Sequence, residues 1–516
     1  MEEITVLSLL PPALALLMII ATRKVLPSLG AGIIIGALLL NDWAVLPSVS
    51  LIWETFAGIF VSEGAINDWE LFIILFLLIL GVMASLISFS GGSRAFGDWA
   101  LQRVKTRVGS QLITLIFGIL VFIDDYFNSL TVGQVSQPLT DRHKVSRAKL
   151  AYIVDSAAAP ICVLAPLSSW GAYIITIIDD ILSNYSEIPY SGLQAFIYML
   201  PMNFYAIAAI LFVFLVIVWK LDIGSMRKHE ERAIVHQQLL DPSRKNVPGD
   251  QAQDLDTHNG SVSDLVIPII ALIVSTVSIM VFTGVRAAEN VTALTIFAET
   301  DVARSLVYGG LIGLGASFLL TLGKRPSAVN VIKTSWNGIK SMLPAIYILI
   351  LAWIIVTIID QLQTGEYLAS QIDDSISVVF LPALLFVLAG LIAFSTGTSW
   401  GTFTILLPIA GEIAGVLDLS MILPFLAAVL AGSILGDHCS PISDTTILSS
   451  TGAGSHHIDH VVTQLPYAIL TAIGAFAGFL VLGMTGSTLG GLSTALLLIL
   501  AIGFYLKNTV TSLPQN

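Results

Sequence analysis

Apolar runs long enough to cross a lipid bilayer recur along the whole chain, and no other feature restricts its fold as much. A transmembrane helix needs about 20 mostly apolar residues. Clear segments of this kind occupy 4–22, 28–46, 69–90, 196–219, 264–284, 303–323, 340–360, 460–483 and 486–506. Two further stretches, 109–183 and 378–455, are apolar but interrupted by Pro, Gly, Ser, Thr and Asp. The pattern predicts an all-α polytopic membrane protein with roughly 11–13 spans.

The composition excludes several classes of protein. Only 11% of the 516 residues are charged, whereas a soluble chain carries roughly 25% charged residues. The net charge of −12 and the lack of a long basic run argue against nucleic acid as a partner. Cys162 and Cys439 lie among apolar and small residues, so we expect packing residues rather than a disulfide framework or metal ligands.

The distribution of Lys and Arg predicts how the spans are oriented. Basic residues cluster at 23–24, 103–107, 142–149, 220–263 and 324–325. The connections at 46–68, 184–195 and 361–377 contain none. Because cytoplasmic loops carry an excess of Lys and Arg, we assign the basic group to the cytoplasm. The acidic start Met1-Glu2-Glu3 is unlike a secretory signal. We therefore expect a multi-pass protein of the inner (cytoplasmic) membrane, with the N-terminus outside and the C-terminus in the cytoplasm.

A polar segment in the middle divides the chain into comparable halves. Residues 1–219 and 264–483 form the halves, 220–263 is predicted to be a flexible cytoplasmic linker, and 484–516 adds one transmembrane helix and a cytoplasmic tail. Corresponding polar motifs of the halves lie 272–275 residues apart, and the predicted directions of corresponding spans are opposite. Secondary transporters with inverted repeats have this arrangement, and their sites form near the midplane where broken helices meet.

The polar group of the first half places carboxylates at membrane depth. Asp124 and Asp125 follow the apolar run 112–123, where two adjacent acids are unfavourable unless they have a function. Asp124, Asn128 and Thr131 lie on one face if the segment is helical. Such a face of oxygen atoms suits a hard cation such as sodium. The alternative is that Asp125 and Asn128 only cap a helix end.

A second interruption of the first half lies between Pro166 and Gly171. Ser168 and Ser169 add hydroxyl oxygens there. This composition predicts an interrupted helix that lines a cavity, and a simple turn outside the membrane is the alternative. We expect the nearby basic residues of 142–149 at the cytoplasmic face rather than at a substrate.

The second half combines buried acids with a complete lack of Lys and Arg. Residues 341–506 contain neither, although Glu412, Asp437 and Asp444 lie in or beside apolar segments. A buried carboxylate without a basic partner either stays protonated or holds a cation. A site that alternates between H⁺ and Na⁺ requires both states. For Glu412 the alternative is a helix-end acid that faces water.

Two polar motifs of the second half are candidates for the ion path. The first, 395–402, contains Thr396, Thr398 and Ser399, and it predicts unwound backbone between half-helices, with a polar linker as the alternative. The second, Gly436–Thr446, is the most specific pattern in the chain. Around its Pro441 it gathers Asp437, Ser440, Ser443, Asp444 and Thr445.

The motif Gly436–Thr446, with its Ser-Pro-Ile-Ser-Asp-Thr-Thr core and the following His460–Ala468, resembles the NhaC-type sodium/proton antiporter family of the ion-transporter superfamily. The segment Asp124–Asn128 and the doubled architecture are similar too, so the likeness covers most of the chain outside 220–263. The resemblance implies two re-entrant hairpins, a scaffold and a moving transport domain. The candidate ion ligands that it implies are Asp437, Ser440, Ser443, Asp444 and Thr445, with Asp125 and Asn128. Of these, Asp125, Asn128, Asp437, Ser443 and Asp444 are expected to bind Na⁺.

Inverted repeats would bring the broken segments together near the midplane. We expect Asp125–Asn128 to approach Thr398–Thr402 there, with Ser168–Ser169 and Ser443–Asp444 at the tips of opposing hairpins. The first hairpin should be reached from the cytoplasm and the second from outside.

Three histidines, His456, His457 and His460, cluster with Asp459 after the second motif. The predicted topology puts them at the cytoplasmic surface, where a solvated or pH-sensing cluster is expected. A metal site is the alternative.

These features favour the exchange of Na⁺ for H⁺ by an elevator-like, alternating-access transporter. The alternative is sodium-coupled transport of a small organic solute, either an amino acid or a hydroxy acid of the malate or lactate type. No nucleophile–base pair, metal motif or nucleotide loop indicates an enzyme, and broken inverted halves suit a channel less well. We expect no cofactor beyond the transported ions. The surroundings are the lipid bilayer, and a homodimer is compatible with the sequence.

Overall fold

The computed structural model describes residues 6–509 except 23, 63, 123, 167, 186, 244–259, 289–290, 293–294, 297–298, 365–366 and 368–376. The regular secondary structure of the described residues is helical apart from a short antiparallel pair of strands, in which Val61 is paired with Ile66. The N-terminal elements are η1 (Val6–Leu9), α1 (Leu10–Thr22), α2 (Val25–Leu40), α3 (Val45–Gly58), β1 (Val61–Ser62) and β2 (Ala65–Ile66).

The remaining helices fall before and after the stretch 244–259. Before it lie α4 (Asp68–Phe89), α5 (Gly92–Arg103), α6 (Arg107–Leu120), α7 (Asp125–Arg142), α8 (Arg147–Cys162), α9 (Ser169–Ser183), α10 (Gly192–Met199), η2 (Leu200–Met202), α11 (Phe204–Trp219) and α12 (Gly224–Val235). After it lie α13 (Ser263–Ala287), α15 (Val302–Gly323), α16 (Ala328–Gln361), η3 (Val378–Phe380), α18 (Leu381–Thr396), α19 (Ser399–Leu417), η4 (Leu419–Met421), α20 (Ile422–Cys439), α21 (Asp444–Gly452), α22 (His457–Thr485) and α23 (Thr488–Thr509).

Within the described residues, eight helices are long and apolar enough to cross a membrane. A ninth span results if Gly192–Met202 and Phe204–Trp219, which are bent by 47° at their junction, count as one. This is fewer than the 11–13 spans predicted. Several apolar segments, among them Leu26–Leu40 and Arg107–Leu120, form helices of only 10–17 residues, whereas a full span needs about 20.

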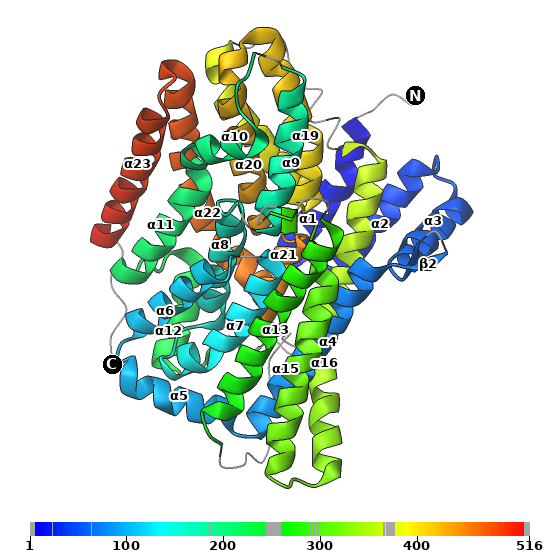
Figure 1. Ribbon diagram of the computed structural model, residues 1–516, viewed down its shortest axis with the longest axis vertical. Coiled ribbons are helices and arrows are strands. Elements are labelled where there is room, and N and C mark those ends of the chain that lie inside the picture. The colour runs from blue at the N-terminus through cyan, green and yellow to red at the C-terminus, as the bar shows by residue number, and fades with distance from the viewer. Residues whose placement is uncertain are drawn as a thin grey trace.

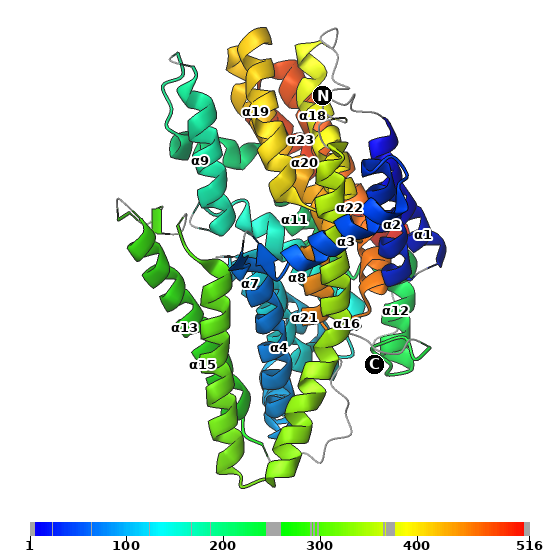
Figure 2. The same cartoon turned by 90° about the vertical axis from the view of Figure 1, so that its right-hand side faces the viewer.

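Four long helices, α4, α13, α15 and α16, pack side by side in the lower part of the molecule (Figures 1 and 2). Small residues bring their backbones together. A Cβ atom at Gly81 of α4 would lie 2.5 Å from the carbonyl oxygen of Gly338 in α16, and one at Gly309 would lie 1.9 Å from Oγ1 of Thr276. Close contact of this kind is the usual means of helix association in membranes.

Helices α6 and α7 form a hairpin, in which the chain reverses between Leu120 and Asp125. The two helices pack against each other. At its closed end, Asn128 Nδ2 donates hydrogen bonds to the carbonyl oxygens of Gly118 (2.7 Å) and Val121 (2.8 Å). Both arms therefore lie on the same side of the turn.

A second hairpin consists of α18 and α19 and turns at Gly397–Thr398. Helix α18 runs parallel to α20, because Gly432 and Gly436 contact Phe386 and Gly390 in the same order. Helix α19 runs the other way, since it begins beside the end of α20 and is joined to its start. Gly397, with φ of +74°, ends α18 in the left-handed conformation that glycine favours.

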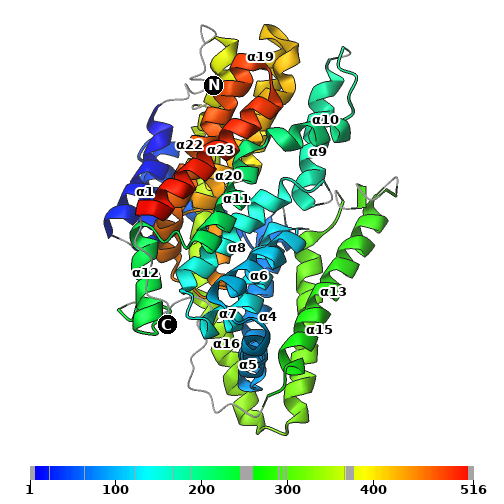
Figure 3. The same ribbon diagram turned by 90° about the vertical axis from the view of Figure 1, so that its left-hand side faces the viewer.

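The other two interruptions lie within helices that continue in the same general direction. Figure 3 shows α8 below α9, and Figure 2 shows α20 above α21. Ser168–Ser169 and Ser443–Asp444 lie at these interruptions, so the prediction that they form hairpin tips is wrong. The chain reverses instead between α6 and α7 and between α18 and α19. Pro166 and Pro441 break helix hydrogen bonding, but the packing of the following helices does not reverse the chain.

The two halves are in direct contact through α7 and α21. A Cβ atom at Gly133 would lie 2.5 Å from the carbonyl carbon of Gly452, so no side chain separates the two helices there. Gln137 Nε2 donates a hydrogen bond of 2.9 Å to the carbonyl oxygen of Gly452. Helix α8 runs antiparallel to α21, because Arg147 contacts Ala453 and Asp155 contacts Ser449.

The first part of the predicted linker 220–263 is not flexible. Helix α12 lies within it and places Glu230 in a fully buried position. The Glu230 carboxylate forms a salt bridge with Arg107, lies 3.6 Å from Lys149 Nζ and accepts a hydrogen bond of 2.8 Å from Ser146 N. These buried charges fix α12 against the starts of α6 and α8. Residues 244–259 of the predicted linker lie outside the described residues.

Candidate functional site

The four interruptions place polar groups next to one another in the interior of the molecule. Asp437, near the end of α20, is 1% exposed. Its Oδ2 accepts hydrogen bonds from Ser399 N (3.0 Å) and Ser399 Oγ (2.6 Å). Its Oδ1 accepts from Ser443 Oγ and, at 3.4 Å, from Thr445 Oγ1. One carboxylate thus connects the start of α19 with the start of α21.

Asp125 is the first residue of α7 and is also buried. Trp170 Nε1, in the first turn of α9, donates a hydrogen bond of 2.9 Å to Asp125 Oδ1. The other oxygen, Oδ2, has no hydrogen-bond partner among the described residues, and neither has Asn128 Oδ1 or Thr131 Oγ1. Buried oxygens in native proteins are usually paired. These free oxygens are therefore available to a cation.

Asp444 opens α21 and faces Asp124 of the first half. Tyr126 donates a hydrogen bond to Asp444 Oδ2, and Thr445 N donates one of 2.8 Å to Asp444 Oδ1. Asp124 is the N-cap of α7, and its Oδ1 accepts a hydrogen bond of 3.0 Å from Phe127 N. Carboxylates of both halves therefore occupy the N-terminal ends of helices, where the helix dipole favours negative charge.

Three of the predicted ligands bond to backbone groups instead. Ser168 Oγ accepts from Gly171 N at 2.8 Å, so this serine caps α9. Thr396 Oγ1 donates to the carbonyl oxygen of Ile392, and Ser440 Oγ donates to that of Phe394, both at 2.8 Å. Ser169 begins α9, and its side chain lies outside the described residues.

The charges of three of these acids have no basic partner in the part of the chain that the structure describes. Among the described residues, no ion pair involves Asp125, Asp437 or Asp444. The described part of the chain also contains no group of three His, Cys, Asp or Glu side chains placed to hold a metal ion. A cation here would thus be held by one aspartate with hydroxyl or amide oxygens, such as Asp437 with Ser399 and Ser443.

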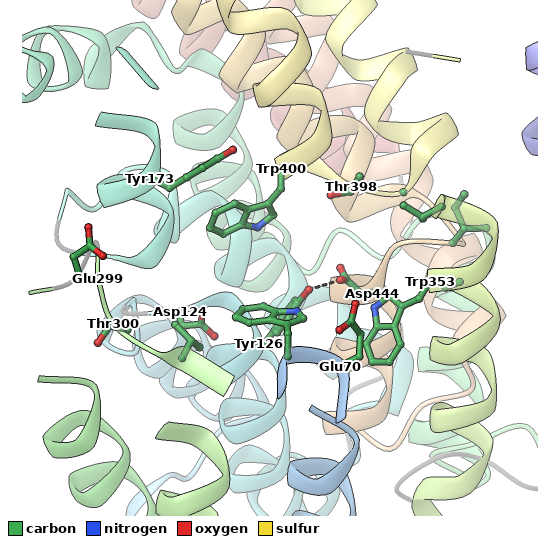
Figure 4. Close-up of a pocket in the computed structure, with 16 residues that line it drawn as sticks. Glu70, Asp124, Tyr126, Tyr173, Glu299, Thr300, Trp353, Thr398, Trp400 and Asp444 are labelled. Atoms are coloured by element: carbon green, nitrogen blue, oxygen red, sulfur yellow. Dashed lines mark hydrogen bonds between the residues drawn. The ribbon is translucent and has the colours of Figure 1, made fainter. Parts of the chain in front are cut away.

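A cavity of about 580 Å³ opens beside this group. Thr398 and Asp444 line it, together with Gly397 from the second hairpin tip and Asp124 from the first. Figure 4 shows Glu70, Asp444 and Trp353 at one side of the cavity, and Asp124, Thr300 and Glu299 at the other. The remaining lining residues are Trp69, Tyr126, Tyr173, Val302, Ala352, Val356, Trp400 and Ile442.

A second buried polar group lies around Asp155 of α8, which is fully buried. Gln464 Nε2 donates to Asp155 Oδ2 at 2.6 Å, His460 Nε2 lies 3.0 Å from the same oxygen, and Ser449 Oγ donates to Oδ1 at 3.1 Å. Gln464 also contacts His438, which is hydrogen-bonded to Tyr205. These polar contacts connect α11 with α21. They include His438, the residue next to Asp437.

The histidine cluster differs from the prediction of a solvated surface group. His457 is 2% exposed and His460 is not exposed. His457 Nε2 lies 2.8 Å from the carbonyl oxygen of Pro441, at the interruption between α20 and α21. His457 and His460 are buried because α22 packs its first turns against α8 and α21, whereas His456 is partly exposed. Charge distribution along the sequence does not reveal this contact.

Sequence patterns also missed residues that the structure places at the site. Tyr126, Trp170 and Trp400 adjoin helix interruptions. Their position next to the polar motifs in the sequence could have identified them as site residues. Glu70 and Trp353 come from α4 and α16, which are long apolar helices without such a motif.

Comparisons with known proteins give a family match over most of the chain. The model of the Na⁺/H⁺ antiporter family matches residues 161–484. An uncharacterized protein of Haemophilus influenzae is 47% identical over 508 residues, which are 98% of this chain and 96% of that protein.

Two further comparisons are weaker. The malate-2H⁺/Na⁺-lactate antiporter of Bacillus subtilis is 29% identical over 193 residues, covering 36% of this chain and 39% of that protein. Among solved structures, the YdaH transporter of Alcanivorax borkumensis is similar with a TM-score of 0.34 and 16% identity, covering 89% of each chain.

Proposed function

Because the chain belongs to the Na⁺/H⁺ antiporter family and is a multi-pass membrane transporter rather than an enzyme, we propose that it exchanges Na⁺ for H⁺ across the cytoplasmic membrane. The observation that carries this proposal is the environment of Asp437. Its carboxylate is buried, bonded to hydroxyls and one backbone N–H, and has no basic partner among the described residues. Such a group is stable only with a proton or a cation.

The hydroxyls around Asp437 suit both occupants. A hydroxyl group can donate its hydrogen to a carboxylate, or rotate and offer an oxygen lone pair to a cation. Ser399, Ser443 and Thr445 are thus hydrogen-bond donors to the protonated carboxyl group and ligands in the Na⁺-bound state. Because one carboxylate holds either ion, release of H⁺ on one side permits binding of Na⁺ there.

The two hairpins support an alternating-access cycle of the elevator type. Asp124 from one tip and Gly397–Thr398 from the other line one site, although the arms of the hairpins extend in opposite directions from it (Figures 1 and 2). Inverted repeats of this kind expose a central site to each side in turn. In this proposal the halves 1–219 and 264–483 are the repeats, and the ends bearing Lys and Arg face the cytoplasm.

The test is ion exchange in proteoliposomes that contain the purified protein and a pH-sensitive dye. An imposed Na⁺ gradient should move H⁺ in the opposite direction without any organic solute. Asp437→Asn should abolish this movement and leave the protein folded, because it removes a buried charge that has no basic partner. Asp418→Asn is the matched control, since Asp418 is exposed and Asn can still cap the following turn. A well-folded Asp437→Asn protein that exchanges ions at the wild-type rate would contradict the proposal.

One observation favours a second function, sodium-coupled transport of a small organic solute. The cavity of about 580 Å³ is far larger than an ion and lies within the range of small-molecule sites, which is roughly 300–1,000 Å³. The similarity to a transporter of malate and lactate points the same way. Uptake of a labelled solute that requires Na⁺ would favour this function over simple ion exchange.

A further inference from the structure

We propose that the cavity beside Asp444 binds a small organic cation, an amine or a guanidinium compound, as a transported substrate. The proposal rests on the transport function above and names the class of solute. Four carboxylates line the cavity, from Glu70, Asp124, Glu299 and Asp444, and its described lining includes no Lys, Arg or His. A charge balance of this kind attracts cations and repels organic acids.

The aromatic lining of the cavity fits an organic cation better than a bare metal ion. Trp69 and Tyr126 lie with ring centroids 6.1 Å apart, and Tyr173 and Trp400 lie 4.6 Å apart. Trp353 completes the aromatic lining. The faces of such rings attract ammonium and guanidinium groups, and carboxylates close by bind their N–H hydrogens.

Helix N-termini, which bind anionic substrates in other transporters, each already have an internal acceptor at the four helix starts near this cavity. The N-terminus of α7 is capped by Asp124, and that of α9 by Ser168. The first N–H of α19 donates to Asp437. Near the start of α21, Thr445 N donates to Asp444. At three of these helix starts the acceptor is an aspartate, which would repel the carboxylate of an anionic substrate.

Asp444 connects the cavity to the ion-binding group. It lines the cavity, opens the same helix as Thr445, and follows Ser443, both of which contact Asp437. An organic cation that pairs with Asp444 adds positive charge beside Asp437. Binding of the organic cation and of Na⁺ should consequently compete, as exchange of one for the other requires.

The test is titration of the full-length protein in nanodiscs, with tryptophan fluorescence as the readout. The cationic probes are putrescine and choline, and malate is the anionic control. Both cations should bind, malate should not, and Na⁺ should weaken the binding of putrescine. Glu70→Gln and Trp400→Ala should each weaken putrescine binding about threefold to thirtyfold. The matched controls are Glu54→Gln and Trp336→Ala, whose side chains are exposed and lie outside the cavity lining.

The outcomes separate this inference from the exchange of Na⁺ for H⁺. Proteoliposomes that move H⁺ in response to Na⁺, with a protein that binds neither cation, would overturn the inference and leave the exchange function intact. Binding of malate in place of the cations would also overturn it, as would cation binding that the cavity variants do not change. Cation binding that depends on Glu70 and Trp400 supports the inference even in a protein that shows no exchange of Na⁺ for H⁺.

Discussion

Two serines of one short motif have different partners, although Ser440 and Ser443 lie only three residues apart. Ser440 Oγ bonds to the backbone of α18, whereas Ser443 Oγ bonds to the Asp437 carboxylate. A hydrogen bond to a charged group contributes about 1.5–3 kcal/mol. We predict that Ser443→Ala raises the Na⁺ concentration for half-maximal exchange about tenfold or more. Initial rates in proteoliposomes over a range of Na⁺ concentrations measure this change.

Ser440→Ala is the control within the same motif. It removes a hydrogen bond between two helices and should lower the free energy of unfolding by about 1 kcal/mol, with little effect on Na⁺ affinity. If both variants change Na⁺ affinity equally, Ser443 is not an ion ligand.

At the scale of helices, α12 is fixed by one buried acid. Burial raises the pKa of Glu230, but the Lys149 ammonium and the Arg107 guanidinium outweigh this effect and hold the pKa below its usual range. Glu230→Gln leaves Arg107 without this charged partner and should reduce the free energy of unfolding by about 3 kcal/mol at neutral pH. Unfolding by denaturant in detergent measures the loss, and Glu231→Gln, at an exposed neighbouring position, is the control.

The pH dependence of this loss has a definite sign. A carboxyl group whose pKa is depressed in the folded protein stabilises it fully above the unfolded pKa, near 4.5, and loses this effect as the pH falls further. The difference between the wild type and Glu230→Gln should therefore shrink below pH 4.5. A difference that grows on acidification would contradict the assignment.

Residues 244–259 follow α12, and their sequence is polar with few apolar residues. Because loop closure depends only weakly on length, removal of ten residues from 247–256 should leave exchange rates within about twofold of the wild type. Deletion of α12 itself, Gly224–Val235, should destabilise the protein, because it removes Glu230 from Arg107 and leaves the buried Lys149 with Asp222 as its one acidic partner among the described residues. The check is exchange activity of protein that inserts correctly, and an inactive shortened variant would show that the segment contributes to transport.

Sequence patterns located the helix interruptions but not the direction of the chain after each one. Gly397 and Pro441 are local signals that regular helix ends. Whether α19 turns back and α21 continues depends on packing against α20 and α7, which no local pattern contains. Asp437, Ser399 and Ser443 were found because acids and hydroxyls stand out in apolar sequence. Sequence patterns do not identify Glu70 and Trp353, because a single residue in an apolar helix becomes part of a site only through tertiary contacts.

At the scale of the whole molecule, one basic connection and one connection without Lys or Arg lie at opposite ends. The connection between α15 and α16 carries Lys324 and Arg325 and lies at the bottom of Figure 1, whereas the connection between α9 and α10 lies near the top. We predict that Asn184→Cys, after α9, reacts with an impermeant maleimide from outside the cell. Asn330→Cys, at the start of α16, should react only in inverted vesicles.

Both substitutions belong in a background of Cys162→Ala and Cys439→Ala, and both positions are exposed. Because the two variants replace the same residue type, differences in labelling report the side of the membrane. Labelling of both from one side would contradict the proposed orientation.

The contact between α7 and α21 has a consequence for biosynthesis. Gln137 and Gly452 are bonded to each other but lie 315 residues apart. At roughly 5–20 residues per second, the ribosome needs about 15–60 s to make the chain between them. During that interval α7 lies in the membrane without α21. The glycine of α7 that packs on α21, like the acids at the start of α7, then lacks its partners from the second half. In this state the newly made first half is open to binding by insertion factors and to degradation by proteases. Slow translation of the second half should accordingly reduce the yield of the whole transporter before it affects any rate of transport.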